Sequence, residues 1–363
     1  MTQLWNMTAK ELKIPFRVSF KHASADRKVT SAIYVEVVSR SGNVGRGEGC
    51  PRQYVTGETL YSAFSFFTQI KQEALSISDV ESLISFVGDH KYTIDANPAA
   101  WCAIEIAILD LMAKERDITI EQLLGLPECS GSFHYSAVMG VLSIDAFHKQ
   151  LGQYIAGGFH DFKLKLSGNL ETDYERLAAF QNHQNIRLRL DANNLWQDVQ
   201  DALAYLQALP FVFWAIEEPL SPGDFPGCVQ LAEILGIRII LDESFLREDQ
   251  FANLLPPQNL WLPNIRISKM GGLIRSLQVM QEGVKNGFQF IVGAQVGETS
   301  ILTRAALSLV NAYRDQVVAQ EGAFGTHLLE YDLTEHPIMF GPAGLLEIDY
   351  RNTLGLGISD WRN

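Results

Sequence analysis

The sequence predicts an α/β protein with a (β/α)8-type, modified TIM barrel that follows an N-terminal α+β domain. One observation is a spacing: Lys165, Asp191, Glu217, Asp242 and Lys269 follow one another at intervals of 26, 26, 25 and 27 residues. Each stands at the end of a short apolar run of the kind that forms a buried strand. One strand and one return helix need about this many residues, so the spacing indicates repeated βα units. The other observation is that strand-like and helical runs alternate only in the later part of the chain.

The N-terminal part of the chain predicts strands first and helices afterwards. Residues 33–38 and 44–48 are strand-like, and the turn-forming sequence Ser-Arg-Ser-Gly-Asn between them indicates a hairpin. A helix is predicted from Pro98 to Lys114, where apolar residues follow helical spacing and proline stands at the first position. We therefore predict an α+β domain over residues 1–128.

Eight βα units are predicted for residues 129–335. The strand-like runs are residues 133–140, 162–166, 186–190, 212–216, 237–241, 262–268, 288–294 and 317–320. Amphipathic stretches such as residues 172–182 supply the intervening helices. A further strand-like run at residues 341–350 lies in the C-terminal segment, residues 336–363, which we predict to return to the N-terminal domain.

Composition narrows the classes of function. The chain has 363 residues, 47% of them apolar, which is enough for a large core. Its net charge of −13 gives no support for binding to nucleic acid or to an anionic membrane, because both need a cationic surface. We expect a cytoplasmic protein, since residues 1–8 lack a signal-peptide pattern and no apolar run is long enough for a membrane span. The four cysteines form no C-x-x-C pair, which disfavours a disulfide framework or a thiolate zinc site.

Three carboxylates stand at the predicted ends of adjacent strands. In a (β/α)8 barrel these ends open at one mouth, where catalysis takes place. Asp191, Glu217 and Asp242 would supply hard oxygen ligands that suit Mg²⁺, with Mn²⁺ as an alternative. Each aspartate taken singly could equally be a turn former or a helix N-cap. Residues that cap separate helices, however, would have no reason to recur at one constant interval. The same interval favours Glu217 over the neighbouring Glu218.

Lysines lie on both sides of these acids. Lys163 and Lys165 stand two residues apart on one predicted strand, so both point to the same face, which is the barrel interior if the apolar residues between them face the helices. Their repulsion, beside a divalent cation, should lower the pKa of one lysine and make it a general base. Lys269, on the predicted sixth strand, would serve the opposite face of a substrate. The alternatives are a solvated strand edge for the pair and, for Lys269, a phosphate site with the glycines at 271–272.

Five short motifs resemble those of the enolase superfamily, specifically its muconate lactonizing enzyme subgroup. In order they are Lys163-Leu-Lys165, Asp191-Ala-Asn193, Glu217-Glu-Pro219, Asp242-Glu-Ser244 and Lys269-Met-Gly-Gly272. Residues 45–48 and 55–59 resemble that family's capping domain. The resemblance implies that Asp191, Glu217 and Asp242 hold Mg²⁺, that Lys165 and Lys269 are the acid and base, and that Lys163 tunes Lys165 and neutralises the substrate carboxylate. A Lys or His base beside Mg²⁺ is an established feature of that superfamily.

The resemblance also implies finer contacts. Asn193 would support the metal ligands, and capping loops at residues 16–28 and 50–56 would close over the substrate. Arg52 would meet a second anionic group of the substrate, unless it is an exposed loop arginine. Glu321 stands where the family's dipeptide epimerases carry an Asp-x-Asp pair that receives the substrate ammonium, so this chain departs from that pattern.

These observations together predict an isomerase that abstracts a proton α to a carboxylate through an enediolate. The leading hypothesis is a racemase or epimerase of an N-substituted amino acid or dipeptide. The alternatives are a muconate-type cycloisomerase, an o-succinylbenzoate-type synthase, which would make the enzyme a lyase, and a catalytically silent barrel used as a binding protein. The expected partner is a small-molecule carboxylate, and the family's frequent oligomerisation makes a homo-oligomer a further expectation.

Overall fold

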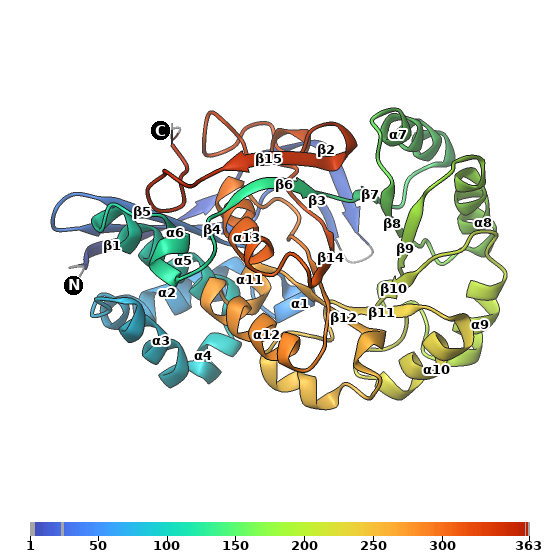
Figure 1. Cartoon of the computed structure of the whole chain (residues 1–363), viewed down its shortest axis with the longest axis horizontal. Helices are drawn as coiled ribbons and strands as arrows, with labels where there is room; N and C mark the ends of the chain where they lie inside the picture. Colours follow the sequence, from blue (N-terminus) through green and yellow to red (C-terminus); the bar gives the residue numbers. More distant parts are fainter. Residues whose placement is uncertain (1–3, 23–24, 360, 362–363) are drawn as a thin grey trace.

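The structure is a computed structural model, and it describes residues 4–22, 25–359 and 361. An antiparallel sheet and a group of helices form the N-terminal part, and a curled parallel sheet with outer helices follows (Figure 1). The N-terminal helices α3 (Val80–Asp89) and α4 (Lys91–Asp95) lie at one end of the molecule, and α8 (Leu170–Ala178) and α9 (Val199–Gln207) lie at the other.

The N-terminal sheet has the strand order β1–β4–β5, and a second hairpin joins β2 to β3. The strands are β1 (Leu4–Leu12), β2 (Pro15–His22), β3 (Ala25–Val29), β4 (Ala32–Ser39) and β5 (Val44–Gly49). The helices are α1 (Gln53–Thr56), α2 (Leu60–Ala74), α3 (Val80–Asp89), α4 (Lys91–Asp95), α5 (Pro98–Glu115) and α6 (Ile120–Leu124). The predicted hairpin is confirmed, because β4 and β5 pair antiparallel with Val38 opposite Val44.

Helix α5 is the centre of this domain and is buried on all sides from Pro98 to Ala113. Strand β5 lies directly against it because glycine occupies every second position, at Gly45, Gly47 and Gly49. A Cβ atom at Gly47 would come within 2.0 Å of the carbonyl oxygen of Ala103. This close approach is possible only without side chains on that face of β5.

The parallel sheet confirms the predicted (β/α)8 fold. Its strands pair in chain order from β7 to β14. They are β7 (Ala137–Met139), β8 (Asp161–Lys165), β9 (Arg187–Asp191), β10 (Ala215–Glu217), β11 (Arg238–Leu241), β12 (Trp261–Ile265), β13 (Phe290–Val292) and β14 (Val317–Gln320). The first and last strands are linked by a hydrogen bond of 2.9 Å from the amide of Ser136 to the carbonyl oxygen of Gln320, which closes the barrel.

Helices α7 (Ile144–Ala156), α8, α9, α10 (Phe225–Leu235) and α12 (Leu273–Lys285) lie on the outer side of this sheet (Figure 1). The short helix α11 (Ile267–Met270) follows β12, and α13 (Ser300–Ala312) follows β13. Ala215, Ile240, Leu262 and Ile291 form a separate buried apolar cluster on four neighbouring strands of the barrel. Within the described ranges, none of the helices has both the length and the apolarity needed to cross a bilayer.

Several predicted strands differ in extent from the observed ones: β10 begins only at Ala215, and β13 covers only Phe290–Val292. The run at 133–140 is divided into β6 (Ser130–His134) and β7, and β6 pairs antiparallel with β15 (Leu345–Asp349) instead of joining the barrel. The run at 262–268 ends at Ile265, and residues 267–270 form the short helix α11. Lys269 is therefore on a helix after the sixth strand, so its predicted place on the strand is wrong. The domain boundaries after residues 128 and 335 stay predictions.

Candidate active site

The predicted acids lie together at the carboxyl ends of three adjacent strands. Asp191 ends β9 and Glu217 ends β10, and the two residues are direct neighbours in the parallel register. Lys165 ends β8 and is the neighbour of Asp191 on its other side. Asp242 follows the last residue of β11. The regular spacing of these residues in the sequence thus places their side chains in one row across the mouth of the barrel.

Lys163 and Lys165 point into the barrel, as predicted from their alternation. The ammonium group of Lys163 is 2.8 Å from both carboxylate oxygens of Glu217 and 3.2 Å from Oδ2 of Asp191. The Nζ atom of Lys165 donates to Oδ2 of Asp191 at 2.6 Å and to Oδ1 of Asn193 at 3.1 Å. Asn193 has a left-handed backbone conformation (φ 46°), which asparagine tolerates better than most residues. These contacts exclude a solvated strand edge for the two lysines.

Lys269 approaches the same row of acids from the other side of the barrel. Four steps in the strand order separate β8 from β12, so in a closed barrel of eight strands they lie opposite each other. The Nζ atom of Lys269 donates to Oδ1 of Asp242 at 3.0 Å, and to the carbonyl oxygens of Asp242 and Asn264 at 2.8 and 2.6 Å. The amine thus belongs to the carboxylate cluster and not to a phosphate site with Gly271 and Gly272.

Cations control the ionisation of three acids in this cluster. Burial raises the pKa of Asp191, Asp242 and Glu321, but the positive charges beside them outweigh burial and leave each pKa below its ordinary value. Glu321 accepts hydrogen bonds from Lys163 at 3.2 Å and from Arg189 at 2.8 Å. Its pKa falls to about 2. These acids are therefore ionised at neutral pH.

Glu217 behaves differently from its acidic neighbours. Burial raises its pKa to about 7, and the negative charges around it add to this effect, although Lys163 opposes them. A carboxylate with a raised pKa is one at which the surrounding positive charge does not fully compensate burial and repulsion. The positive charge around Glu217 is therefore too small to stabilise its ionised form fully, and an added cation would be favourable there.

The buried lysines also differ from each other. Burial lowers the pKa of Lys163, yet Asp191, Glu217 and Glu321 raise it above the ordinary value of a lysine. At Lys269 burial prevails over the charge of Asp242, and the pKa is lowered. The pKa is thus lowered at Lys269 and raised at Lys163, and the lowering expected within the Lys163–Lys165 pair beside a divalent cation stays a prediction. A lowered pKa makes the neutral amine, which is the basic form, easier to reach.

The donor set suits a divalent cation, although cationic side chains stand between its members. Asp191, Glu217 and Asp242 are hard oxygen ligands on adjacent strand ends, and all three are almost fully buried. In the described part of the chain, no three acidic, histidine or cysteine side chains are arranged as a metal site as they stand. Lys163 spans Asp191 and Glu217, and Arg266 spans Glu217 and Asp242.

Arg52 is placed away from this cluster. Its guanidinium group donates to the carbonyl oxygens of Ser31, Pro51 and Val296 at 2.7, 2.8 and 2.7 Å, and its side chain is buried. It therefore ties the N-terminal domain to the loop after β13 and is not an exposed loop arginine. The capping loops expected at residues 16–28 and 50–56 correspond to the β2–β3 hairpin and α1, and residues 23–24 lie outside the described residues.

Two residues of the site, Arg189 and Arg266, were missed in the sequence, and Glu218 was considered only as the alternative to Glu217. Arg189 lies two residues before Asp191 on β9, and its Nη2 atom also donates a hydrogen bond to Oγ of Ser136 at 3.0 Å. The alternation Arg-Leu-Arg-Leu at 187–190 repeats that of the lysine strand and was a usable signal. Glu218 accepts from the amide of Asp242 at 2.7 Å and fixes the loop that carries this ligand. Arg266 stands on the sixth-strand loop, and nothing in the sequence indicated that its side chain reaches back to two acids.

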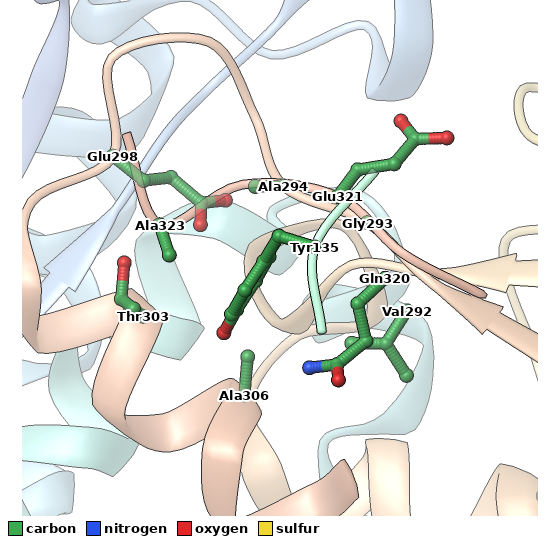
Figure 2. A pocket seen from close by; sticks show the side chains of 10 residues that line it. All are labelled: Tyr135, Val292, Gly293, Ala294, Glu298, Thr303, Ala306, Gln320, Glu321 and Ala323. Atoms are coloured by element: carbon green, nitrogen blue, oxygen red, sulfur yellow. The ribbon is translucent and has the colours of Figure 1, made fainter. Parts of the chain in front are cut away.

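A small cavity lies beside the last barrel strands, between Tyr135, Glu298, Thr303 and Glu321. Its volume is about 10 Å³, enough for about one water molecule. Figure 2 shows the carboxylate of Glu321 pointing away from the ring of Tyr135, in keeping with its bonds to Lys163 and Arg189. The cavity is too small for an amino-acid derivative, so the mouth of the barrel is the candidate substrate site.

Comparisons with known proteins agree with this geometry. Residues 146–359 match the sequence profile of the family described as enolase C-terminal domain-like. A hydrophobic dipeptide epimerase of Enterococcus faecalis is 27% identical over 352 residues, which cover 96% of this chain and 97% of that protein. An N-succinyl-L-Arg/Lys racemase of Bacillus cereus is 25% identical over 308 residues, which cover 81% of this chain and 80% of that protein.

A solved structure shows the same fold over the whole chain. The crystal structure of the dipeptide epimerase from Enterococcus faecalis V583, complexed with Mg and the dipeptide L-Leu-L-Tyr, superimposes with a TM-score of 0.84. The sequence identity is 26%, and the match covers 99% of this chain and 100% of that one. The eight-stranded barrel and the N-terminal α+β domain are thus shared with a magnesium-containing crystal structure.

Proposed function

The chain belongs to the enolase C-terminal domain-like family, and we propose that it is a Mg²⁺-dependent racemase or epimerase acting on an N-substituted amino acid or a dipeptide. The observation that carries the proposal is the pair of buried lysines with carboxylates between them: Lys165 ends β8, and Lys269 lies on α11 directly after the opposite strand, β12. Inversion at an α-carbon needs one group on each face of the substrate, and this arrangement supplies both.

The two lysines take complementary roles in the proposed reaction. One amine removes the α-proton from its face of the substrate, and the ammonium on the other face returns a proton. The lowered pKa of Lys269 suits the role of base for one enantiomer. Lys163, whose pKa is raised by its three acidic neighbours, stays charged and is placed to neutralise the substrate carboxylate. Asn193 orients Lys165 by accepting its hydrogen bond.

Asp191, Glu217 and Asp242 would hold the divalent cation, with Mg²⁺ as the proposed ion and Mn²⁺ as an alternative. Bound there, the cation supplies positive charge that stabilises the negative charge developing on the substrate carboxylate. The raised pKa of Glu217 supports this assignment, because the acids around it leave an unmet demand for a cation.

Substrate choice is the finer part of the proposal. The relatives include a dipeptide epimerase and a racemase of N-succinyl amino acids. At the end of β14, Glu321 is already bonded to Lys163 and Arg189 through its two oxygens. A free α-ammonium on the substrate would have to share the carboxylate of Glu321 with these two cations, which would repel it. The contacts of Glu321 therefore favour amino acids whose nitrogen is acylated over dipeptides with a free N-terminus.

We also propose that the enzyme works in the cytoplasm. Cys102, Cys129 and Cys228 are free and buried, which suits a reducing compartment. The proposed partner is a small-molecule carboxylate, and a homo-oligomer stays an expectation.

The test is exchange of the α-proton in D₂O. N-acyl amino acids, N-succinyl amino acids and dipeptides of both configurations are incubated with enzyme and Mg²⁺, and proton NMR follows loss of the α-proton while polarimetry follows inversion. We expect exchange with inversion for at least one N-acylated series, and no exchange for a Lys165→Met, Lys269→Met double variant. A broad panel without any exchange would contradict the proposal.

A further inference from the structure

Arg266 connects two of the three carboxylates that face the barrel mouth. It is the residue between β12 and α11, and its Nη2 atom makes a close contact with Oδ2 of Asp242 and lies 3.8 Å from Oε1 of Glu217. Its Nη1 atom donates to Oε1 of Gln295 at 3.2 Å. The guanidinium group thus stands between the acidic ends of β10 and β11, where a cation shared by these acids would also stand.

We propose that Arg266 is an internal counter-ion of the carboxylate cluster and competes with the divalent cation for Glu217 and Asp242. The inference rests on the proposed function, because it takes these acids as ligands. Lys163, Lys165, Lys269 and Arg266 already pair with the acids of the mouth. A doubly charged cation added to a buried site repels the side-chain cations that are present, so one of them must withdraw.

The contacts indicate that Arg266 is the cation that withdraws. The side chain of Lys269 is 0% exposed, and its amine also donates to two backbone carbonyls, which would lose a partner. Lys163 is 2% exposed and holds both oxygens of Glu217. Lys165 is 10% exposed, but its ion pair is with Asp191, so its withdrawal would not free the other two acids.

Arg266 has few other hydrogen bonds, although the charges of Glu243 and Glu321 also attract its guanidinium group. Its side chain is 11% exposed, and beyond the two acids its bond is to the amide of Gln295. Its Nε atom is buried without a hydrogen-bond partner among the described residues. A rotation of this long side chain toward the barrel mouth would open the space between Glu217 and Asp242 and leave no backbone carbonyl unpaired.

Competition predicts opposite effects in the two states of the protein. Without a divalent cation, loss of the guanidinium leaves Glu217 and Asp242 short of positive charge and destabilises the fold. With the cation, the same loss removes a competitor and tightens binding. A residue that merely supported the fold would give the first effect without the second, and a residue that helped to hold the cation would weaken binding.

The experiment compares the wild type with Arg266→Met, which keeps the apolar stem, and with Arg266→Lys, which keeps the charge. Arg351→Met, which removes an exposed arginine paired with Asp349, is the matched control. Magnesium chloride is titrated into each protein by calorimetry, and thermal unfolding is recorded in EDTA and in excess Mg²⁺. We expect Arg266→Met to bind Mg²⁺ about tenfold more tightly, on the scale of coupling between sites, and to unfold at a lower temperature in EDTA. Arg266→Lys should lie between it and the wild type, and Arg351→Met should match the wild type.

Each outcome separates this inference from the proposed function. If the wild type and Arg266→Met bind Mg²⁺ equally, or the variant binds more weakly, competition is refuted while the metal site stands. If neither protein binds Mg²⁺, both the inference and the metal-dependent function fail. If Arg266→Met does not fold in EDTA, the Mg²⁺ titration of Arg266→Lys decides. The shorter lysine side chain reaches only one of the two acids, so this variant should still bind Mg²⁺ more tightly than the wild type.

Discussion

Two groups of buried carboxylates in this molecule have neighbours of different kinds. At the barrel mouth Asp191, Asp242 and Glu321 face ammonium and guanidinium groups, which hold each pKa below its ordinary value. The name mouth cluster is used for the acids Asp191, Glu217, Asp242 and Glu321 together with the cations Lys163, Lys165, Arg266 and Lys269. In the N-terminal domain three other glutamates are equally buried, but hydrogen bonds from uncharged groups surround them. We call Glu48, Glu58 and Glu105 the N-terminal acids.

The N-terminal acids bind amides and hydroxyls. Glu48 accepts from Oγ1 of Thr299 at 2.6 Å, and Glu105 accepts from the amide of Ile274 at 2.9 Å, so both reach the barrel. Glu58 accepts from the amides at the start of α5. Burial raises the pKa of Glu48 to about 8 and the pKa values of Glu58 and Glu105 to about 7.

The difference shows that burial alone does not define a reactive acid. A buried carboxyl group that accepts hydrogen bonds from amides loses little stabilisation when it is protonated, because its neutral form still accepts hydrogen bonds. An acid held by cations cannot become neutral without leaving those cations unpaired in a buried place. Charge is therefore needed in the mouth cluster and is dispensable in the N-terminal acids, and the following predictions test this distinction.

The largest expected effect is on the two lysines of the mouth cluster that face each other. Lys269→Met should lower the rate of epimerisation by about 10³-fold or more, because an acid–base group on one face is lost. Exchange of the α-proton should persist for the enantiomer that Lys165 deprotonates, and Lys165→Met should show the opposite preference. Proton NMR in D₂O with each pure enantiomer measures this. Equal loss for both enantiomers would contradict the two-sided arrangement, and Lys285→Met, on an exposed lysine, serves as control.

A second prediction concerns the need for charge at the mouth cluster. Asp242→Asn keeps the shape of the side chain but leaves Lys269 and Arg266 without their ionised partner. We expect a loss of about 3–5 kcal/mol in the free energy of unfolding, typical of a broken buried ion pair. Mg²⁺ should also cease to raise the unfolding temperature. Urea unfolding in EDTA and thermal unfolding in Mg²⁺ measure the two effects. An unchanged stability in EDTA would show that the charge of Asp242 is dispensable.

The regular part of the site could be predicted from the sequence because strand geometry is local. A side-chain period of two places Lys163 and Lys165 on one face, and parallel strands bring residues of equal phase to one edge. The eight-stranded barrel and the enolase-superfamily resemblance are therefore both confirmed. The roles assigned to the individual residues stay predictions.

The parts that could not be predicted depend on side-chain reach and on distant pairing. Arg266 extends from the loop after β12 to acids on two other strands, and Glu321 pairs with Arg189 across the barrel closure. Neither contact follows from a periodic pattern. The division of the first predicted strand has a similar cause, because β6 pairs with β15, more than 200 residues later in the chain. Such long-range pairing leaves no local signal near residue 134.

A third prediction tests whether a neutral side chain is tolerated at an N-terminal acid. Glu105 accepts hydrogen bonds from the amide of Ile274 and, at 3.2 Å, from the indole of Trp101. Glu105→Ala should cost about 1–3 kcal/mol of unfolding free energy, because these buried donors lose their acceptor. Glu105→Gln keeps an acceptor and should cost clearly less than Glu105→Ala. Urea unfolding of both variants beside Asp242→Asn gives the comparison. If the glutamine is as harmful as the alanine, the two regions do not differ in their need for charge.

The last prediction concerns a slope and not the stability at one pH: the pH dependence of the free energy of unfolding should change at Glu48. The pKa of this buried acid is about 8 in the folded protein, raised from an ordinary value of 4.5. Between these values the folded state keeps a proton that the unfolded state releases, so the contribution of Glu48 to stability is complete below pH 4.5 and is lost as the pH rises to 8. Glu48→Gln removes this proton, and the slope of unfolding free energy against pH should become less negative by about 1.4 kcal/mol per pH unit. Urea unfolding from pH 5 to 9 measures the slope, with Glu347→Gln on the exposed face of β15 as control. Parallel slopes for Glu48→Gln and the wild type would mean that Glu48 is ionised in the folded protein, like the acids paired with cations at the mouth.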